Sequence, residues 1–124
     1  MQDTVVLRIA RVAHEVNRAY CAALGDLTQP AWEDAPAWQV ASAIQGVKLM
    51  ANRPSVTPEA SHENWMKEKE ADGWTWGPVK NTAKKQHPCM VPFDELPGPQ
   101  KAKDMIFTTL VRELLAFDEN GGCQ

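Results

Sequence analysis

The chain has 124 residues, of which 44% are hydrophobic and 23% are charged, and its formal net charge is −3 at pH 7. This size and composition predict one globular domain that can bury a core without disulfide bonds. The acidic balance argues against non-specific binding of duplex nucleic acid, which requires excess positive charge along the phosphates. No apolar run approaches membrane-spanning length and the first residues lack a basic segment, so we expect a soluble cytoplasmic protein with no membrane partner.

Two helices are predicted in the first part of the chain. The first covers about residues 4–24 and ends at Gly25, which supplies a C-terminal stop. Its apolar residues recur at three- and four-residue steps, which predicts one buried stripe of Val5, Ile9, Val12, Val16, Ala19 and Ala23. The second helix opens at Pro36, where the missing N–H has no cost, and Pro54 closes it after about residue 52. Its inward side chains are expected to be Val40, Ile44, Val47 and either Met50 or Ala51.

The third predicted helix is mostly polar. It begins after Thr57, the expected N-cap, has Pro58 in its first turn and ends at Gly73. Trp65 stands at its centre among lysines and glutamates. A tryptophan in that position is either the anchor of a surface helix to the core or a platform for a ligand.

The remaining chain predicts a minor β element and a last helix. Residues 74–98 are expected to hold two short extended segments, Trp74–Trp76 and Met90–Phe93, joined by a lysine-bearing loop. Pro92 lacks an N–H, so the second segment would be an edge strand or an isolated bridge. The last helix covers about residues 100–117, with an apolar face of Ala102, Met105, Ile106, Leu110, Leu114 and Phe117.

The expected fold class is therefore mainly α, a small helical domain of about four helices with a minor two-stranded β element. We expect one domain over residues 1–124, with a helical part (1–56), a motif-bearing part (57–117) and a loose tail (118–124). The three cysteines are scattered and include no Cys-x-x-Cys pair, which argues against a disulfide framework or a zinc site. Cys123 is expected to be a tail thiol, and Cys21 and Cys89 small buried hydrophobic residues.

Several short motifs follow one another in the second half of the chain. They comprise His62, Trp65, the G-W-T-W-G-P run from Gly73 to Pro78, Lys85, the H-P-C run from His87, the V-P-F run from Val91, Leu96, Asp104 and Leu110. Their order and spacing resemble the RyR domain, the repeat module of ryanodine-receptor calcium-release channels, which also occurs as stand-alone proteins of bacteria and bacteriophages. The resemblance covers about residues 57–116. It departs at Trp76, where the channel repeats commonly have tyrosine.

The resemblance implies a helical fold with short strands, no enzymatic activity and no cofactor. In the channels two such repeats pack as a tandem, and an adenine nucleotide can lodge between them with its base against tryptophans at the position matching Trp65. A chain with one repeat could rebuild that arrangement as a homodimer. Prokaryotic members are suspected of binding nucleotide-derived signals, such as ADP-ribose-like messengers of anti-phage defence, in the cytoplasm of a bacterial or phage-infected cell.

The candidate site therefore centres on Trp65, which would stack on a base, whereas the alternative is that it docks its helix onto the core. His62 lies one turn earlier and would donate to a phosphate or a ribose hydroxyl, or else act as an ordinary hydrogen-bonding residue. Trp74 and Trp76 alternate across a short strand, so we expect the first in the core and the second at the rim of the site.

Cations and a second wall complete the candidate set. Lys80 and Lys85 would supply charge for phosphates, with Pro88 fixing the turn beside Lys85. His14 and Asn17 share a face of the first helix and form either a second pocket wall or a helix–helix hydrogen-bond network.

The sequence also favours a binding protein over an enzyme. No nucleophile in a strained elbow, no phosphate-binding glycine loop and no carboxylate-oriented histidine can be identified. We therefore expect a non-catalytic sensor or sequestering protein for a nucleotide-type small molecule. The alternative is a protein-interaction or scaffold module that uses its exposed aromatic patch, because exposed tryptophans are common interface anchors.

Overall fold

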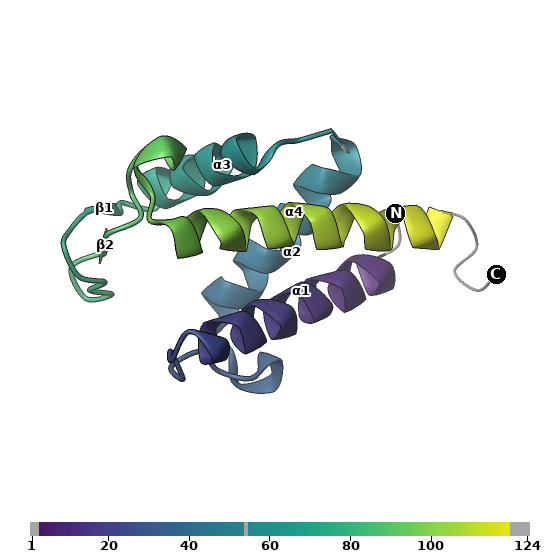
Figure 1. Cartoon of the computed structure of the whole chain (residues 1–124), viewed down its shortest axis with the longest axis horizontal. Coiled ribbons are helices and arrows are strands. Elements are labelled where there is room, and N and C mark those ends of the chain that lie inside the picture. Colours follow the sequence, from purple (N-terminus) through teal and green to yellow (C-terminus); the bar gives the residue numbers. More distant parts are fainter. Residues whose placement is uncertain (1–2, 54, 120–124) are drawn as a thin grey trace. The chain divides into compact units, whose positions relative to one another are not determined.

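The computed structural model describes residues 3–53 and 55–119, and Figure 1 shows the course of the chain. Within these ranges the fold is mainly α, with four α-helices and a two-stranded sheet, as predicted. The chain forms two compact units. The first unit comprises residues up to Val56 together with residues from Ile106 onward, and the second unit is Thr57–Met105. Helix α4 (Gly98–Glu119) contributes residues to both.

The first unit is built on α1 (Asp3–Ala23), which packs against α2 (Ala37–Asn52). A Cβ atom added to Gly46 of α2 would lie 2.8 Å from the ring of Phe107, so glycine there lets α4 approach closely. Arg112 of α4 donates to the carbonyl of Val56 at 2.7 Å. The buried hydrophobic residues of this unit are Val6, Ile9, Ala10, Ala13, Cys21, Val47, Met50, Val56, Val111 and Leu115.

The predicted buried stripe of α1 is wrong apart from Ile9, which is buried, and Val5, which is half-buried. Val12 and Val16 are 36% and 37% exposed, and Ala19 and Ala23 are exposed as well. The helix instead buries a neighbouring face with the small residues Ala10, Ala13 and Cys21. Small side chains allow a close approach of α2, which favours this face although its hydrophobic pattern in the sequence is weaker.

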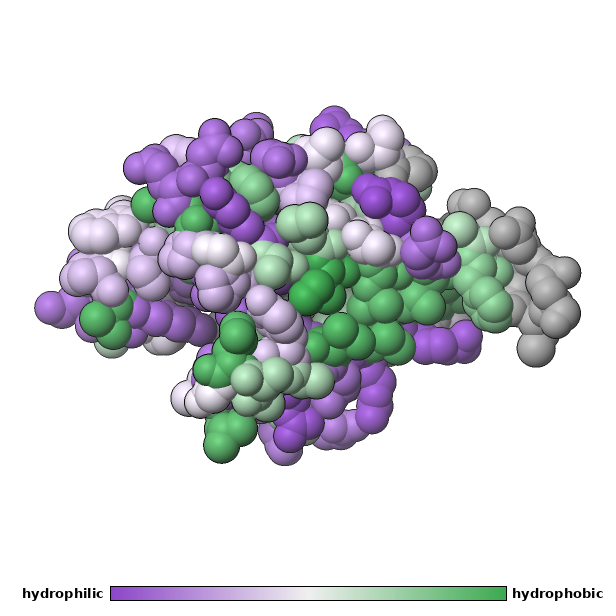
Figure 2. Space-filling view, in the orientation of Figure 1, coloured by the Kyte–Doolittle hydropathy of each residue, from purple (hydrophilic) through white to green (hydrophobic). Residues whose placement is uncertain are grey.

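Helix α4 shows a similar difference from its predicted apolar face. Met105 and Phe117 are 56% and 57% exposed, whereas Thr108 and Val111 are almost completely buried. Figure 2 shows hydrophobic surface over the C-terminal half of α4. The helix extends through Glu119, into the segment expected to be a loose tail, and the rest of that tail with Cys123 lies outside the described residues. Pro54 also lies outside them, although α2 ends at Asn52 as predicted.

The second unit begins with α3 (Pro58–Ala71), whose ends follow from its sequence. The Thr57 hydroxyl accepts the amide of Ala60 at 3.1 Å and caps the first turn, as predicted. At the other end Gly73 adopts φ +92°. The amide of Trp74 returns to the carbonyl of Lys69 at 2.9 Å, which is the Schellman arrangement that a left-handed glycine permits. Figure 2 shows the hydrophilic outer surface of this helix.

The sheet pairs β1 (Thr75–Trp76) in parallel with β2 (Gln86–His87). The second strand was predicted at Met90–Phe93, which is wrong. The chain after Asn81 folds into a tight turn closed by two hydrogen bonds between Asn81 and Gln86, and this turn brings Gln86 back beside β1. Pro92, which cannot donate to a ladder, instead precedes the short 3₁₀ helix η2 (Phe93–Glu95).

Candidate functional site

Five aromatic side chains of the second unit lie in contact with one another. We call them the aromatic cluster: His62, Trp65, Trp74, His87 and Phe93. They come from α3, from β2 and from the segments before β1 and within η2. Two features bring these distant positions together. They are the hydrogen-bonded C-terminal end of α3 and the turn between Asn81 and Gln86, which places β2 beside β1.

Trp65 lies in the middle of α3 and is half-buried. Its ring stacks on His62 at 5.5 Å between centroids with 22° between the planes. The ring of His87 meets it at 5.1 Å and 75°, in an edge arrangement. Part of the indole thus packs within the unit, as expected of an anchor, and part remains accessible.

His62 is 3% exposed, and both of its ring nitrogens face protein groups. Its Nε2 donates to the carbonyl of Val91 at 2.7 Å, while Nδ1 lies 3.8 Å from a carboxylate oxygen of Asp104. Burial raises the pKa of Asp104 to about 6, against the opposing effects of His62 and Lys103. Through these contacts His62 links α3 to two other segments of the second unit, the residues just before η2 and the first part of α4.

His87 was not among the predicted ligand residues, although it lies in the H-P-C run. Its Nδ1 accepts the amide of Cys89 at 3.0 Å, and the side chain is half-buried between Trp65 and Trp74. Burial, followed by the charges of Lys80, Lys69, Lys103 and His62, lowers its pKa to about 4. The imidazole is therefore neutral at pH 7, and the neighbouring positive charges oppose its protonation.

The lysines near the aromatic cluster differ in part from those expected. Lys85 has φ +53° and its Nζ donates to the carbonyl of Asp72 at 2.7 Å, so it ties the turn to the end of α3. Lys80, one of the two expected lysines, is close enough for its charge to act on His87. Lys69 and Lys103 do so too, and Nζ of Lys69 lies 5.4 Å from the ring centroid of Trp74. These two were not predicted because the expected cations were those of the lysine-bearing loop, whereas Lys69 lies on α3 and Lys103 on α4.

The expected alternation of the two tryptophans at β1 is present. Trp74 is 7% exposed and Trp76 is 55% exposed. Pro88 is exposed in the turn that follows His87. No ring contact joins Trp76 to the aromatic cluster among the described residues.

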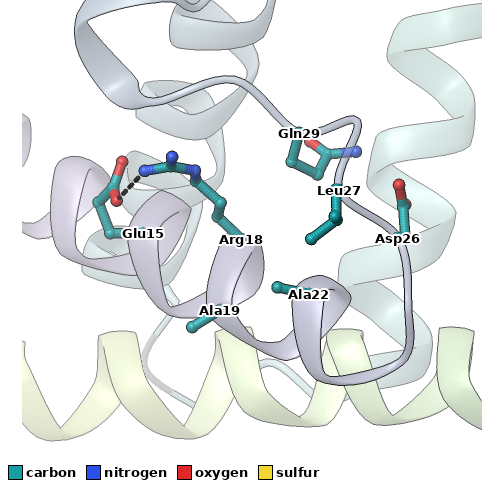
Figure 3. Close-up of a pocket in the computed structure, with 7 residues that line it drawn as sticks. All are labelled: Glu15, Arg18, Ala19, Ala22, Asp26, Leu27 and Gln29. Atoms are coloured by element: carbon teal, nitrogen blue, oxygen red, sulfur yellow. Dashed lines mark hydrogen bonds and ion pairs between the residues drawn. The ribbon is translucent and has the colours of Figure 1, made fainter.

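The two candidates on α1 belong to the first unit. His14 is 7% exposed, its Nε2 donates to the carbonyl of Pro30 at 2.7 Å and its ring lies 5.6 Å from that of Trp32. Asn17 is half-buried. A cavity of about 250 Å³ lies on another face of α1, and its lining comprises Glu15, Arg18, Ala19, Ala22, Asp26, Leu27 and Gln29 (Figure 3).

Comparison with known families decides what kind of chain this is. The sequence model of the RyR domain matches residues 45–119. The chain belongs to the RyR domain family. Such a domain is in general a ligand- or protein-interaction module. The matched residues include the second half of α2 and the whole aromatic cluster, and so begin earlier than the motif runs themselves.

Two features are absent from the described ranges, a membrane-spanning helix and a cluster of metal-binding side chains. No helix there is both long enough and apolar enough to cross a membrane. Within the same ranges, no group of three or more histidine, cysteine or acidic side chains is placed to hold a metal ion. Cys21 and Cys89 are free thiols, the first buried and the second half-buried.

Proposed function

We propose that this RyR-domain protein is a non-catalytic binding protein for a nucleotide or nucleotide-derived small molecule, such as an adenine nucleotide or an ADP-ribose-like signal, which it senses or sequesters. The observation that carries the proposal is the half-buried indole of Trp65 within an aromatic cluster that lies in a field of lysines. A flat heterocycle linked to phosphates matches both properties.

Trp65 would supply the base platform. Stacking of a base on an aromatic side chain contributes about 1–3 kcal/mol and needs only an accessible ring face. The contacts with His62 and His87 hold the indole in one orientation, which reduces the entropy lost on binding. His62 thus supports the platform from behind, and the direct phosphate contact first expected of it is better supplied by neighbouring cations.

The cationic side chains favour the phosphate end of such a ligand. Lys69, Lys80 and Lys103 come from three different segments of the second unit, and their charges all act on His87. The chain has net charge −3, and Asp72 and Glu68 act on Lys69, but the charges that act on His87 are all positive. This local field favours an anionic ligand.

A thermal-shift screen against a nucleotide panel tests this function. ADP-ribose, cyclic ADP-ribose isomers, ATP and AMP are added to the full chain, with intrinsic tryptophan fluorescence as a second readout. We expect at least one of them to raise the melting temperature and quench fluorescence. Unchanged melting and fluorescence across the panel would contradict the proposal.

Substitution of Trp65→Ala should then weaken the binding of the active compound by roughly tenfold to a hundredfold, because the base loses its platform. Trp38→Ala is the matched control, since Trp38 is 43% exposed and belongs to the first unit. Both variants should unfold cooperatively. Equal affinity of the two variants would remove Trp65 from the site.

Homodimerisation is part of the proposal, because a second copy could cover the accessible part of Trp65. Light scattering with and without the active compound measures the molar mass. If the molar mass corresponds to one chain under both conditions, homodimerisation is contradicted and the ligand site lies within a single copy.

One observation favours a second function, the docking of a partner protein. Trp76, the last residue of β1, is 55% exposed, and Val79, in the segment that joins β1 to β2, is 71% exposed. Large exposed apolar side chains of this kind often anchor interfaces. A specific partner captured by the wild type and lost with Trp76→Ala, without any compound that shifts the melting temperature, would favour this function over the first.

A further inference from the structure

Three ring N–H groups of the aromatic cluster have no acceptor in the described part of the chain. They are the indole Nε1–H groups of Trp65 and Trp74 and the Nε2–H of His87, none of which makes a hydrogen bond within residues 3–53 and 55–119. No buried side-chain nitrogen or oxygen in those ranges lacks a partner, so each of the three must reach solvent. The indole N–H of Trp74 therefore also reaches solvent, although the residue as a whole is only 7% exposed.

The tautomer of His87 follows from its hydrogen bond with the main chain. The amide of Cys89 can only donate, so Nδ1 of His87 accepts and carries no proton. A neutral imidazole has one proton, which must then reside on Nε2. The burial and the lysine charges described above keep the ring in this neutral form at pH 7.

The chemistry of this group is one-sided. An indole N–H only donates, the free nitrogen of His87 donates, and the ammonium groups of Lys69, Lys80 and Lys103 also only donate. The charges of all three lysines act on His87, and Lys69 lies over Trp74. Three carboxylates lie near these lysines: Asp104, which is the neighbour of Lys103 and faces His62 across 3.8 Å, and Asp72 and Glu68, whose charges act on Lys69. A ligand that accepts from the three ring N–H groups must present acceptor atoms, and the lysine charges favour a ligand that is negatively charged.

We propose that the Nε1–H groups of Trp65 and Trp74, the Nε2–H of His87 and the lysines Lys69, Lys80 and Lys103 form an oxyanion subsite that binds a phosphate or diphosphate group. The inference deepens the proposed nucleotide function and rests on it for the identity of the whole ligand. It gives Trp65 two separate roles, a ring face for the base and an N–H for an oxygen of the anion.

Inorganic pyrophosphate tests the subsite without a base. In the ¹⁵N-labelled full chain, the five tryptophans give five indole N–H resonances that single Trp→Phe variants assign. We expect pyrophosphate to shift the resonances of Trp65 and Trp74 and the Nε2 resonance of His87, and to leave those of Trp32 and Trp38 in the first unit unchanged. Unchanged chemical shifts of the Trp65, Trp74 and His87 resonances at millimolar pyrophosphate would overturn the proposal. Equal shifts of all five indole resonances would overturn it as well.

The variant Trp65→Phe separates the two roles, because it keeps an aromatic ring and removes the donor. We expect it to bind pyrophosphate roughly tenfold more weakly, the effect of one hydrogen bond to a charged group. Lys103→Gln should weaken binding similarly, whereas Trp38→Phe and the exposed Lys48→Gln should match the wild type. Unchanged affinity of both Trp65→Phe and Lys103→Gln would also overturn the subsite.

Adenosine, AMP and ADP distinguish failure of the subsite from failure of the nucleotide function. Pyrophosphate binding at the three donors with no further gain from an attached adenosine would support the subsite and contradict the nucleotide function. Nucleotide binding that leaves the three donor resonances unmoved would support the function and overturn the subsite. Affinity that rises from adenosine to ADP, with the donors shifting in parallel, supports both.

Discussion

The two units of this protein contain the same local arrangement in different surroundings. His14 in the first unit and His62 in the second are both buried on a helix, both donate Nε2–H to a main-chain carbonyl at 2.7 Å, and both lie within 6 Å of a tryptophan ring, at 5.6 Å and 5.5 Å. In the first unit the adjoining carboxylate of Glu15 accepts the amide of Trp32, and this bond lowers the pKa of Glu15.

The difference lies in what surrounds each tryptophan. Around Trp65 there is a second histidine with a free donor nitrogen and the charges of three lysines, whereas the pair at Trp32 adjoins carboxylates and a guanidinium. A buried histidine beside a tryptophan is therefore a structural link in both units. Ring N–H groups without an acceptor and the lysine charges that act on His87, rather than the buried histidine itself, therefore distinguish the second unit as the candidate binding unit.

The first prediction tests whether the two histidines are equivalent links. His62→Ala should lower the free energy of unfolding by about 2–4 kcal/mol. The substitution leaves the Val91 carbonyl without its donor, and it opens a cavity because the His62 side chain is only 3% exposed. His14→Ala should cost about 1–3 kcal/mol through the loss of its bond to Pro30. Urea unfolding measures both.

Glutamine at either position is the matched control, since its amide can still donate to the carbonyl. It should recover part of the stability in both units. If His62→Ala unfolds with the stability of the wild type, the histidine is not a structural link, and its role in ligand contact would have to be reconsidered.

The second prediction concerns pH and applies to the second unit alone. The pKa of His87 is lowered from 6.5 to about 4, so the stability that its neutral form contributes is complete above pH 6.5 and is lost as the pH falls towards 4. The pKa of Asp104 is raised from 3.8 to about 6, so its contribution is complete below pH 3.8 and is lost as the pH rises through 6. The two contributions oppose each other between pH 4 and 6.5.

Single substitutions should therefore separate them. Relative to the wild type, Asp104→Asn should lose stability more steeply between pH 6.5 and 4, because His87 is left unopposed. His87→Gln should gain stability relative to the wild type over the same fall in pH. Melting temperatures at half-unit pH intervals measure the curves, and two variant curves parallel to that of the wild type would contradict these environments.

The third prediction concerns the smallest loss of stability, which we expect to be the same in both units. Helices α1 and α3 both end on a left-handed glycine, Gly25 with φ +93° and Gly73 with φ +92°. A side chain meets nothing within 4 Å at Gly25 and only Lys85, at 3.8 Å, at Gly73. Alanine at either site should therefore cost about 1 kcal/mol from backbone strain alone. Denaturant midpoints of the two variants check this, and a much larger loss at Gly73 would indicate that the turn beside Lys85 is also disturbed.

Local signals in the sequence predicted the parts of the fold that depend on local chemistry. The N-cap at Thr57, the glycine stops at Gly25 and Gly73 and the opposite facing of Trp74 and Trp76 are all confirmed. Each is determined by residues within one turn or one strand, so neighbouring positions in the chain contain the information.

Features that depend on tertiary packing were not predicted. The buried face of α1 includes small residues such as Ala10 and Ala13, whereas hydrophobic periodicity favours a different face of the helix. The strand at Gln86–His87 depends on a turn at Asn81 that returns the chain to β1. The role of His87 depends on lysines from α3 and α4 that are remote in sequence.

Calorimetric titration of ADP-ribose into the wild-type chain and into Trp65→Ala tests the central claim most directly, namely that the aromatic cluster of the second unit binds a phosphate-bearing heterocycle. We expect saturable heat with the wild type and affinity at least tenfold weaker with Trp65→Ala, while Trp38→Ala should match the wild type. Equal affinities for all three proteins would contradict it.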